Sequence, residues 1–325
     1  MRLWQNLLPL VAGKMPPAPA ANVVLRVAGG DGRRVQDDRE MQRLTYLLLT
    51  ILAWQAQTAP RSPRTREQPV TVMFCDIANY SRLAERAGPI ASHRLVHEIL
   101  ERVTDCIEAE GGSVVDYYGD GVLVMWNAPT AQPDHAERAC RAALATQAEV
   151  PELSAAWADY AETPLQVRCT LNSGPALVGN TGTTRRGKYG PMGHTVNLAQ
   201  RVQTASKFFG SPIVLTAATR TQLDASSFAL RRLGNVRLPS MAQPTELFEL
   251  HVAELGWSAQ RDAFENALAL FEQGRWHDAC RASHSLVDVP QHELDLASLR
   301  LLGRAVEHLM LPPVEFAGVW ELGGR

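Results

Sequence analysis

The segment Ser113–Trp126 constrains the fold most, because it predicts a β-hairpin with a carboxylate at its turn. Its two flanks, SVVDYY and GVLVMW, are rich in β-branched, aromatic and apolar residues and enclose Gly119-Asp120-Gly121. Glycines on either side of an Asp allow the positive φ angles of a tight turn. Asp120 is therefore expected at the tip of the hairpin.

A second carboxylate, Asp76, stands near the end of the apolar run Thr71–Ile77. Burying a carboxylate in such a run costs free energy unless a cation or several donors compensate it. If this strand neighbours the hairpin, Asp76 and Asp120 converge, and a carboxylate pair suits Mg²⁺, which is usually held by one or two carboxylates plus substrate phosphates. The alternative is that Asp120 is only a turn residue and Asp76 a strand-end cap.

Four motifs, in order, resemble the catalytic domain of the class III adenylate/guanylate cyclases. They are Phe74-Cys75-Asp76-Ile77, Gly111-Gly112, Gly119-Asp120-Gly121 and Gly193-His194-Thr195-Val196-Asn197-Leu198-Ala199-Gln200-Arg201. The resemblance covers residues 68–252. It implies an α+β fold with a ferredoxin-like βαββαβ core, and the order strand, helix, hairpin, helix, strand agrees with a split βαβ sheet that carries its helices on one face.

The resemblance also implies roles for individual residues. Two Mg²⁺ or Mn²⁺ ions are expected on Asp76, Asp120 and the Ile77 carbonyl; Asn197 is expected to orient the ribose, Arg201 to stabilise the transition-state phosphate and Arg168 to contact the terminal phosphates. The four-residue spacing of Asn197 and Arg201 places both on one helix face, although such a pair is common on solvated helices. Arg168 is alternatively an ordinary edge-strand arginine.

Some positions depart from the family pattern. ATP-reading members carry Lys four residues before the second metal Asp and Asp or Thr after the aromatic residue of the arm, whereas this chain has Asp116 and Gly190. A carboxylate accepts hydrogen bonds from guanine N1 and its 2-amino group, which an ammonium cannot do, so the change favours GTP over ATP. The alternative is that Asp116 faces solvent and the base pocket is relaxed.

Two further departures concern the triphosphate and the strand of Arg168. Pro239-Ser240 replaces an expected Lys-Gly and removes a phosphate-binding cation, and Thr170 stands where Gly is usual. Two functions follow: an active cyclase that converts GTP or ATP to a 3′,5′-cyclic nucleotide, or a degenerate cyclase that binds nucleotide or a partner. Since the family divides its metal and Asn/Arg residues between two protomers, a homodimer with two equivalent sites is expected.

The remaining features set the context of this domain. A net charge of −2 gives no reason to expect nucleic-acid binding, and five scattered cysteines without metal-ligand spacing fit a reducing cytoplasm. The expected parts are an N-terminal region of unknown role (1–36), a helix and linker (37–67), the cyclase-like domain (68–252) and a helical extension (255–325). The apolar core of the 37–57 helix, residues 44–54, is too short to cross a bilayer.

Periodicity predicts the other elements. Helices are expected at 89–110, 135–148, 195–208, 259–272, 276–287 and 293–310, strands at 165–171, 176–178 and 245–250, and an exposed basic arm at 183–188. Residues 267–279 resemble one tetratricopeptide unit. One such unit cannot bury its apolar face alone, so the extension is expected to pack on the cyclase-like domain or on a protein partner.

Overall fold

The structure is a computed structural model, which describes residues 65–160, 163–183, 187–224, 226–251, 256–288 and 295–322. All described residues belong to one compact unit, Ser62–Arg325. The N-terminal region 1–36 and the helix expected at 37–57 lie outside the described residues. The described fold is therefore that of this unit alone.

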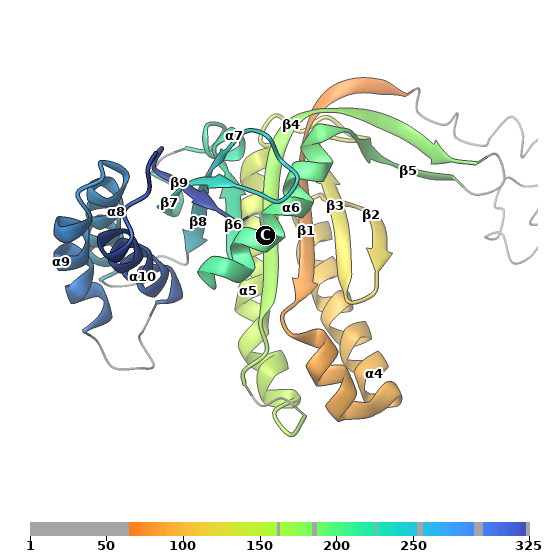
Figure 1. Cartoon of the computed structure of the whole chain (residues 1–325). Coiled ribbons are helices and arrows are strands. Elements are labelled where there is room, and N and C mark those ends of the chain that lie inside the picture. The colour runs from red at the N-terminus through yellow and green to blue at the C-terminus, as the bar shows by residue number, and fades with distance from the viewer. Residues whose placement is uncertain are drawn as a thin grey trace, which may run out of the picture. The chain divides into compact units, whose positions relative to one another are not determined.

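The ferredoxin-like core is built from the first six elements. They are β1 (Arg66–Ile77), α4 (Tyr80–Ala109), β2 (Ser113–Tyr118), β3 (Gly121–Trp126), α5 (His135–Ala156) and β4 (Val167–Gly182). In the sheet these strands have the spatial order β2-β3-β1-β4, and β1 is antiparallel to both of its neighbours. The predicted βαββαβ order and hairpin are confirmed (Figure 1).

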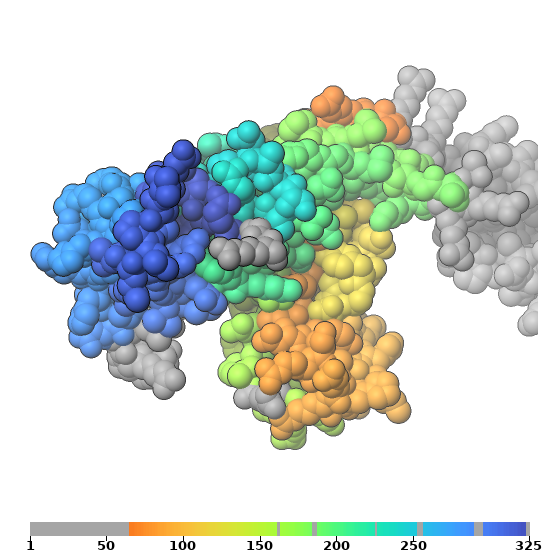
Figure 2. All heavy atoms as spheres, in the orientation of Figure 1, coloured from red at the N-terminus to blue at the C-terminus, as the bar shows by residue number. Residues whose placement is uncertain are grey.

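The sheet continues beyond β4. The later elements are β5 (Gly187–Met192), α6 (His194–Phe209), β6 (Ile213–Thr216), α7 (Ala217–Arg220), β7 (Ala229–Arg237) and β8 (Thr245–His251). Strand β6 lies parallel to β4, and β8 and β7 follow it in the sheet. Strand β5 pairs with the far part of β4 to form a ribbon that extends away from the helices (Figures 1 and 2).

Helices cover both faces of this sheet. Met73, Cys75 and Ile77 of β1 pack with α4 and α5, whereas Val72 and Phe74 point the other way and share a buried cluster with Ala199 of α6. Alternate side chains of a strand point to opposite faces, so α6 lies across the sheet from α4 and α5 (Figure 1). The two helices of the predicted βαββαβ core, α4 and α5, therefore share one face as expected, and α6 adds a helix on the other face.

Several predicted boundaries also change. Helix α4 begins at Tyr80, nine residues before the predicted start, and Gly88 breaks it with a φ of 74°. Helix α5 runs through Pro151 to Ala156, beyond the predicted end at residue 148. The two strands expected at 165–171 and 176–178 are one continuous strand of 16 residues, β4, since β1 pairs with it on both sides of Gly174.

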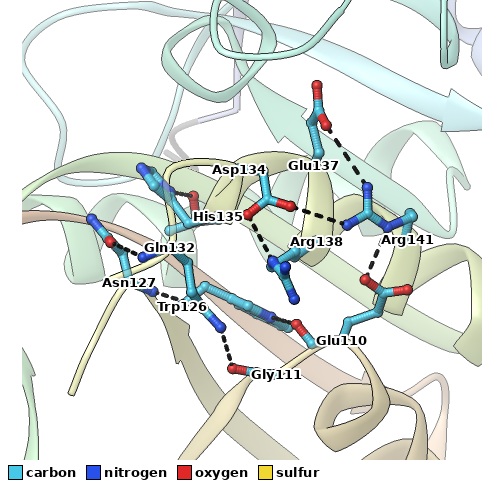
Figure 3. Close-up of polar contacts among 11 residues, drawn as sticks. Glu110, Gly111, Trp126, Asn127, Gln132, Asp134, His135, Glu137, Arg138 and Arg141 are labelled. Atoms are coloured by element: carbon cyan, nitrogen blue, oxygen red, sulfur yellow. Dashed lines mark hydrogen bonds and ion pairs between the residues drawn. The ribbon is translucent and has the colours of Figure 1, made fainter. Parts of the chain in front are cut away.

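The loop that joins β3 to α5 is fixed by side-chain amides. The backbone N–H of Asn127 donates to Gln132 Oε1 at 2.8 Å, and the backbone N–H of Gln132 donates to Asn127 Oδ1 at 2.6 Å (Figure 3). Gln132 Nε2 also donates to the Gly111 carbonyl at 2.8 Å. This loop therefore ties the open end of the hairpin to the end of α4, at the opposite end from Asp120.

The C-terminal residues add three helices and one strand to the same unit. They are α8 (Trp257–Glu272), α9 (Trp276–Val287), α10 (Leu296–Met310) and β9 (Val319–Glu321). Strand β9 lies parallel to β7 at the edge of the sheet, and the buried Trp320 packs against Phe209 and Phe271. The three helices lie where helices were predicted, but a tetratricopeptide-like character is not established. Within the described residues, no helix is both long and apolar enough to span a membrane.

Candidate active site

Asp76 and Arg168 form a bidentate ion pair at the ends of two central strands. They are register partners on β1 and β4. Arg168 Nε donates to Asp76 Oδ1 and Arg168 Nη2 donates to Asp76 Oδ2, each at 2.8 Å. The two side chains are only 11% and 16% exposed. The pair supplies the cation that burial of Asp76 required, and since β4 lies inside the sheet, Arg168 is not an edge-strand residue.

Asp120 reaches the same strand end from the hairpin turn. Its Oδ2 accepts a hydrogen bond from the Ile77 backbone N–H at 3.3 Å. Burial raises the pKa of the Asp120 carboxyl, and the nearby Asp76 carboxylate raises it further. Both expected metal carboxylates therefore lie at one point, together with the residue whose carbonyl was expected as the third ligand.

This donor set fits a hard divalent cation. Carboxylate and carbonyl oxygens are the ligands that Mg²⁺ prefers, and Mg²⁺ usually completes its shell with waters and substrate phosphates. Among the described residues, no three or more His, Cys, Asp and Glu side chains cluster so as to hold a metal ion. A cation on this carboxylate pair would therefore take its remaining ligands from water or from a bound molecule.

Asn197 and Arg201 both project from the outer side of α6. Both residues are exposed, whereas Leu198, Ala199 and Val202 on the same helix are buried against the sheet. Neither side chain hydrogen-bonds or forms an ion pair with another described residue. The helix therefore presents an amide and a guanidinium outward, free to meet a ligand or a second protein surface.

The residues expected to read the base lie between the hairpin and the ribbon. Asp116 Oδ2 accepts from Lys188 Nζ at 2.5 Å, and the two side chains are 47% and 51% exposed. The hydrogen bond from Lys188 lowers the pKa of the Asp116 carboxyl. The sequence interpretation missed Lys188. It lies two residues before Gly190 on β5, and this spacing was the available signal, since alternate strand residues share a face.

Gly190 is required by close packing. A Cβ built on it would lie 2.5 Å from Val115 Cγ1, closer than real Cβ atoms approach. An acidic residue at this position therefore needs a shift of Val115 or of the ribbon. At the other departure, Pro239 lies in the turn after β7, and the neighbouring Arg237 is paired with Glu321 at 3.1 Å and also donates to the Ala242 carbonyl.

The domain that carries these residues matches a known protein family. The family model for the adenylate and guanylate cyclase catalytic domain matches residues 63–251, more than half of the chain. The chain belongs to this cyclase family. The cyclase domain is 30% identical over 184 residues to adenylate cyclase 1 of Rhizobium meliloti, a match that covers 56% of this chain and 27% of that protein.

Solved cyclase structures share the fold of this domain. The adenylyl cyclase CyaB from P. aeruginosa superimposes with a TM-score of 0.55 at 25% identity, covering 59% of this chain and 97% of that one. The guanylyl cyclase Cya2 gives a TM-score of 0.52 at 26% identity, covering 58% and 95%. The chain spans only about a quarter of the curated relative's length, so the resemblance concerns the catalytic domain.

Proposed function

We propose that this chain is an active nucleotide cyclase that converts GTP or ATP into a 3′,5′-cyclic nucleotide and pyrophosphate for intracellular signalling. The observation that carries the proposal is the meeting of Asp76, Asp120 and Arg168 at one strand end, within a domain of the cyclase family. The free thiols of all five cysteines agree with a reducing cytoplasm.

The reaction joins the ribose 3′-oxygen to the α-phosphorus and breaks the bond from that phosphorus to pyrophosphate. Asp76, Asp120 and the Ile77 carbonyl are the residues that would hold two divalent cations. When bound, these cations supply charge for the triphosphate and activation of the 3′-hydroxyl. Arg168 would contact the terminal phosphates, and its guanidinium lies beside Asp76, one of the carboxylates that would hold the cations.

The other half of the site is assigned to α6. Asn197 orients the ribose, and Arg201 stabilises the charge that develops on the phosphate in the transition state. Asp116 and Gly190 line the base pocket, where Asp116 accepts from the edge of guanine. The ion pair with Lys188 keeps this carboxylate ionised and therefore able to accept.

A homodimer would bring the two halves together. Asn197 and Arg201 are exposed and unpartnered in the described part of the chain, and the β4–β5 ribbon exposes Leu177 and Met192, which are directly opposed register partners with 43% and 46% exposure. Apolar side chains at the extended ribbon would be covered by a second copy. The proposed dimer has two equivalent sites, each with the carboxylates of one copy and α6 of the other.

A degenerate cyclase that binds nucleotide without turnover is the second candidate. The observation that favours it is the turn at Pro239, which offers no cation, while the nearby Arg237 is occupied by Glu321. Weak triphosphate binding follows if no other cation replaces the missing lysine. On this hypothesis the C-terminal helices would transmit the bound state to a protein partner.

The deciding experiment incubates the purified chain with each of the four ribonucleoside triphosphates and Mg²⁺ or Mn²⁺, and measures cyclic product by mass spectrometry. The proposal expects product from GTP or ATP, its loss in Asp76→Asn and its retention in Asp134→Asn, a matched acid at the start of α5. Nucleotide binding without cyclic product under every condition would overturn the enzyme and favour the degenerate cyclase.

A further inference from the structure

Helix α6 carries the two proposed catalytic side chains and begins without a side-chain cap. Its N-cap residue, Gly193, has a φ of 125° and no side chain with which to cap the first turn. Asn197 and Arg201 are exposed, and no side-chain partner among the described residues holds them. Their positions therefore depend on how the helix itself is held against the sheet.

Two polar side chains of β4 hold the inner side of this helix. Thr170 Oγ1 donates to the Ala199 carbonyl at 3.0 Å, and Asn172 Nδ2 donates to the Thr195 carbonyl at 2.8 Å. Both side chains are buried, Thr170 completely and Asn172 with 2% exposure. Leaving a buried donor without its acceptor costs free energy, so these two hydrogen bonds restrict how α6 can be oriented on β4.

The spacing of the donors matches the spacing of the acceptors. Two residues along a strand span about 6.8 Å, and four residues along a helix span about 6 Å and return to the same side. Thr170 and Asn172 thus lie opposite the Ala199 and Thr195 carbonyls, which are about one helical turn apart. Turning α6 by one residue, about 100°, would remove both acceptors at once.

The Asn172 side chain is itself held in place. Its Oδ1 accepts from Thr216 Oγ1 at 2.7 Å, which fixes the orientation of the amide and directs Nδ2 at the helix. Thr195 Oγ1 adds a 2.6 Å hydrogen bond to the Pro175 carbonyl, back on β4. Three hydrogen bonds therefore join the first two turns of α6 to β4. In each of them the donor side chain, Thr170, Asn172 or Thr195, belongs to a buried residue.

We propose that Thr170 and Asn172 are positioning residues that set the rotation and height of α6 and thereby aim Asn197 and Arg201. The inference rests on the proposed function, since it assigns to these residues a part in the same reaction. Arg168 lies two residues before Thr170 on the same face of β4, so one strand positions both the phosphate-binding arginine and the helix. The hydrogen bond to Ala199 gives a positioning function to Thr170, which stands where the family usually has glycine.

The test compares two substitutions of Thr170 with a control on the same helix. Thr170→Val keeps the shape and removes the hydroxyl, and Thr170→Ser keeps the hydroxyl. Ser206→Ala is the matched control, because Ser206 Oγ is buried and donates to the Ser211 carbonyl at 2.7 Å at the far end of α6. Each full-length variant is compared in kcat, KM and amide hydrogen exchange across α6.

We expect Thr170→Val to lower kcat by about 10- to 100-fold with KM nearly unchanged, because small misplacements of catalytic groups cost this much. Exchange should quicken at residues 196–200 and stay slow near Ser206. Thr170→Ser should restore both readouts, and Ser206→Ala should keep the wild-type kcat. A wild-type kcat in Thr170→Val, or an equal loss of kcat in Ser206→Ala, would overturn the positioning role.

Failure of the proposed function gives a different pattern. If the wild-type chain forms no cyclic product, the catalytic assignment of α6 fails with the enzyme, whatever the variants do. Hydrogen exchange then still decides whether β4 holds the helix. Unchanged exchange at residues 196–200 in Thr170→Val would show that the hydroxyl does not hold it, and would overturn the inference independently of activity.

Discussion

Arg168 binds the carboxylate of Asp76 with both of its donors, at 2.8 Å each, in a position where neither group is more than 16% exposed. The Arg168 guanidinium occupies both carboxylate oxygens of Asp76, which a divalent cation would need as ligands. If Asp76 holds a cation as proposed, that cation competes with Arg168, and the released guanidinium would lie beside the proposed triphosphate site. Replacement of Arg168 by a cation on Asp76 would then couple cation binding to phosphate binding.

This competition predicts opposite effects in one variant. Arg168→Gln should bind Mn²⁺ more tightly than wild type without nucleotide, by several-fold, because the competing ion pair is gone. The same variant should raise the KM for the triphosphate by about 10-fold or more, because a charge-assisted contact is lost. Isothermal titration with Mn²⁺ measures the first effect and steady-state kinetics the second.

The control for this experiment is Arg138→Gln, which removes an arginine of α5 paired with Asp134 at 2.7 Å. It should change neither quantity. Equal Mn²⁺ affinity in wild type and Arg168→Gln would contradict the competition, even if turnover fell.

Base selectivity gives a second prediction. Asp116→Lys should move the ratio of kcat/KM for GTP to that for ATP towards ATP, by about 10-fold, because an ammonium can donate to adenine N1 and cannot accept from guanine. Adding Gly190→Asp should strengthen the shift only with a smaller residue at position 115, since a Cβ at Gly190 meets Val115 at 2.5 Å. An unchanged ratio in Asp116→Lys would refute base reading by this position.

The sequence predicted the core of this domain because its motifs are local. The hairpin around Asp120, the strand ending at Asp76 and the helix of Asn197 each follow from a short pattern of apolar and turn residues. Pairings across the sheet were not predictable in this way. The strand β7 and its neighbour β9 are joined through residues more than 80 positions apart, such as Arg237 and Glu321, which no local pattern specifies.

Contacts between distant residues were equally unpredictable in the candidate active site. Asp76 and Asp120 were identified from local sequence patterns and Arg168 from the family resemblance, and the structure brings the three together. The partner of Asp116 was not foreseen, because Lys188 reaches it from another strand, 72 residues along the chain. The departure at Thr170 likewise had no interpretation until its hydroxyl was found on the Ala199 carbonyl.

A third prediction concerns pH. His135, at the start of α5, is buried, and its Nδ1 lies 2.7 Å from Thr71 Oγ1. Burial lowers the pKa of the imidazole, and the Asp134 carboxylate opposes this only in part. In the folded chain His135 therefore binds a proton less readily than in the unfolded chain, where a histidine has a pKa of about 6.5.

The contribution of His135 to stability is thus fully present above that pH and is lost as the pH falls below it. Urea unfolding between about pH 7.5 and 5.5 should show a falling free energy of unfolding. His135→Gln, which has no titrating ring and can still hydrogen-bond Thr71, should show a shallower fall. Parallel curves for the two proteins would contradict the assignment.

A fourth prediction tests the C-terminal strand. Trp320 is 1% exposed and contacts Phe208 and Phe209 at the end of α6 as well as Phe271 of α8. Trp320→Ala should lower the free energy of unfolding by about 3–5 kcal/mol, the cost of emptying an aromatic core site. Val314→Ala, at a fully exposed residue of the same tail, should change it by less than about 0.5 kcal/mol. Equal stability of both variants would show that β9 does not belong to the core.

The proposed dimer with shared sites is tested most directly by mixing two inactive variants. Asp76→Asn removes a proposed metal ligand and Arg201→Ala removes the guanidinium proposed to stabilise the transition state, and each homodimer should be inactive. In an equal mixture that exchanges subunits, half of the dimers are heterodimers with one intact site, so turnover should recover to about a quarter of wild type. A mixture as inactive as its components, with subunit exchange shown by native mass spectrometry, would contradict the account.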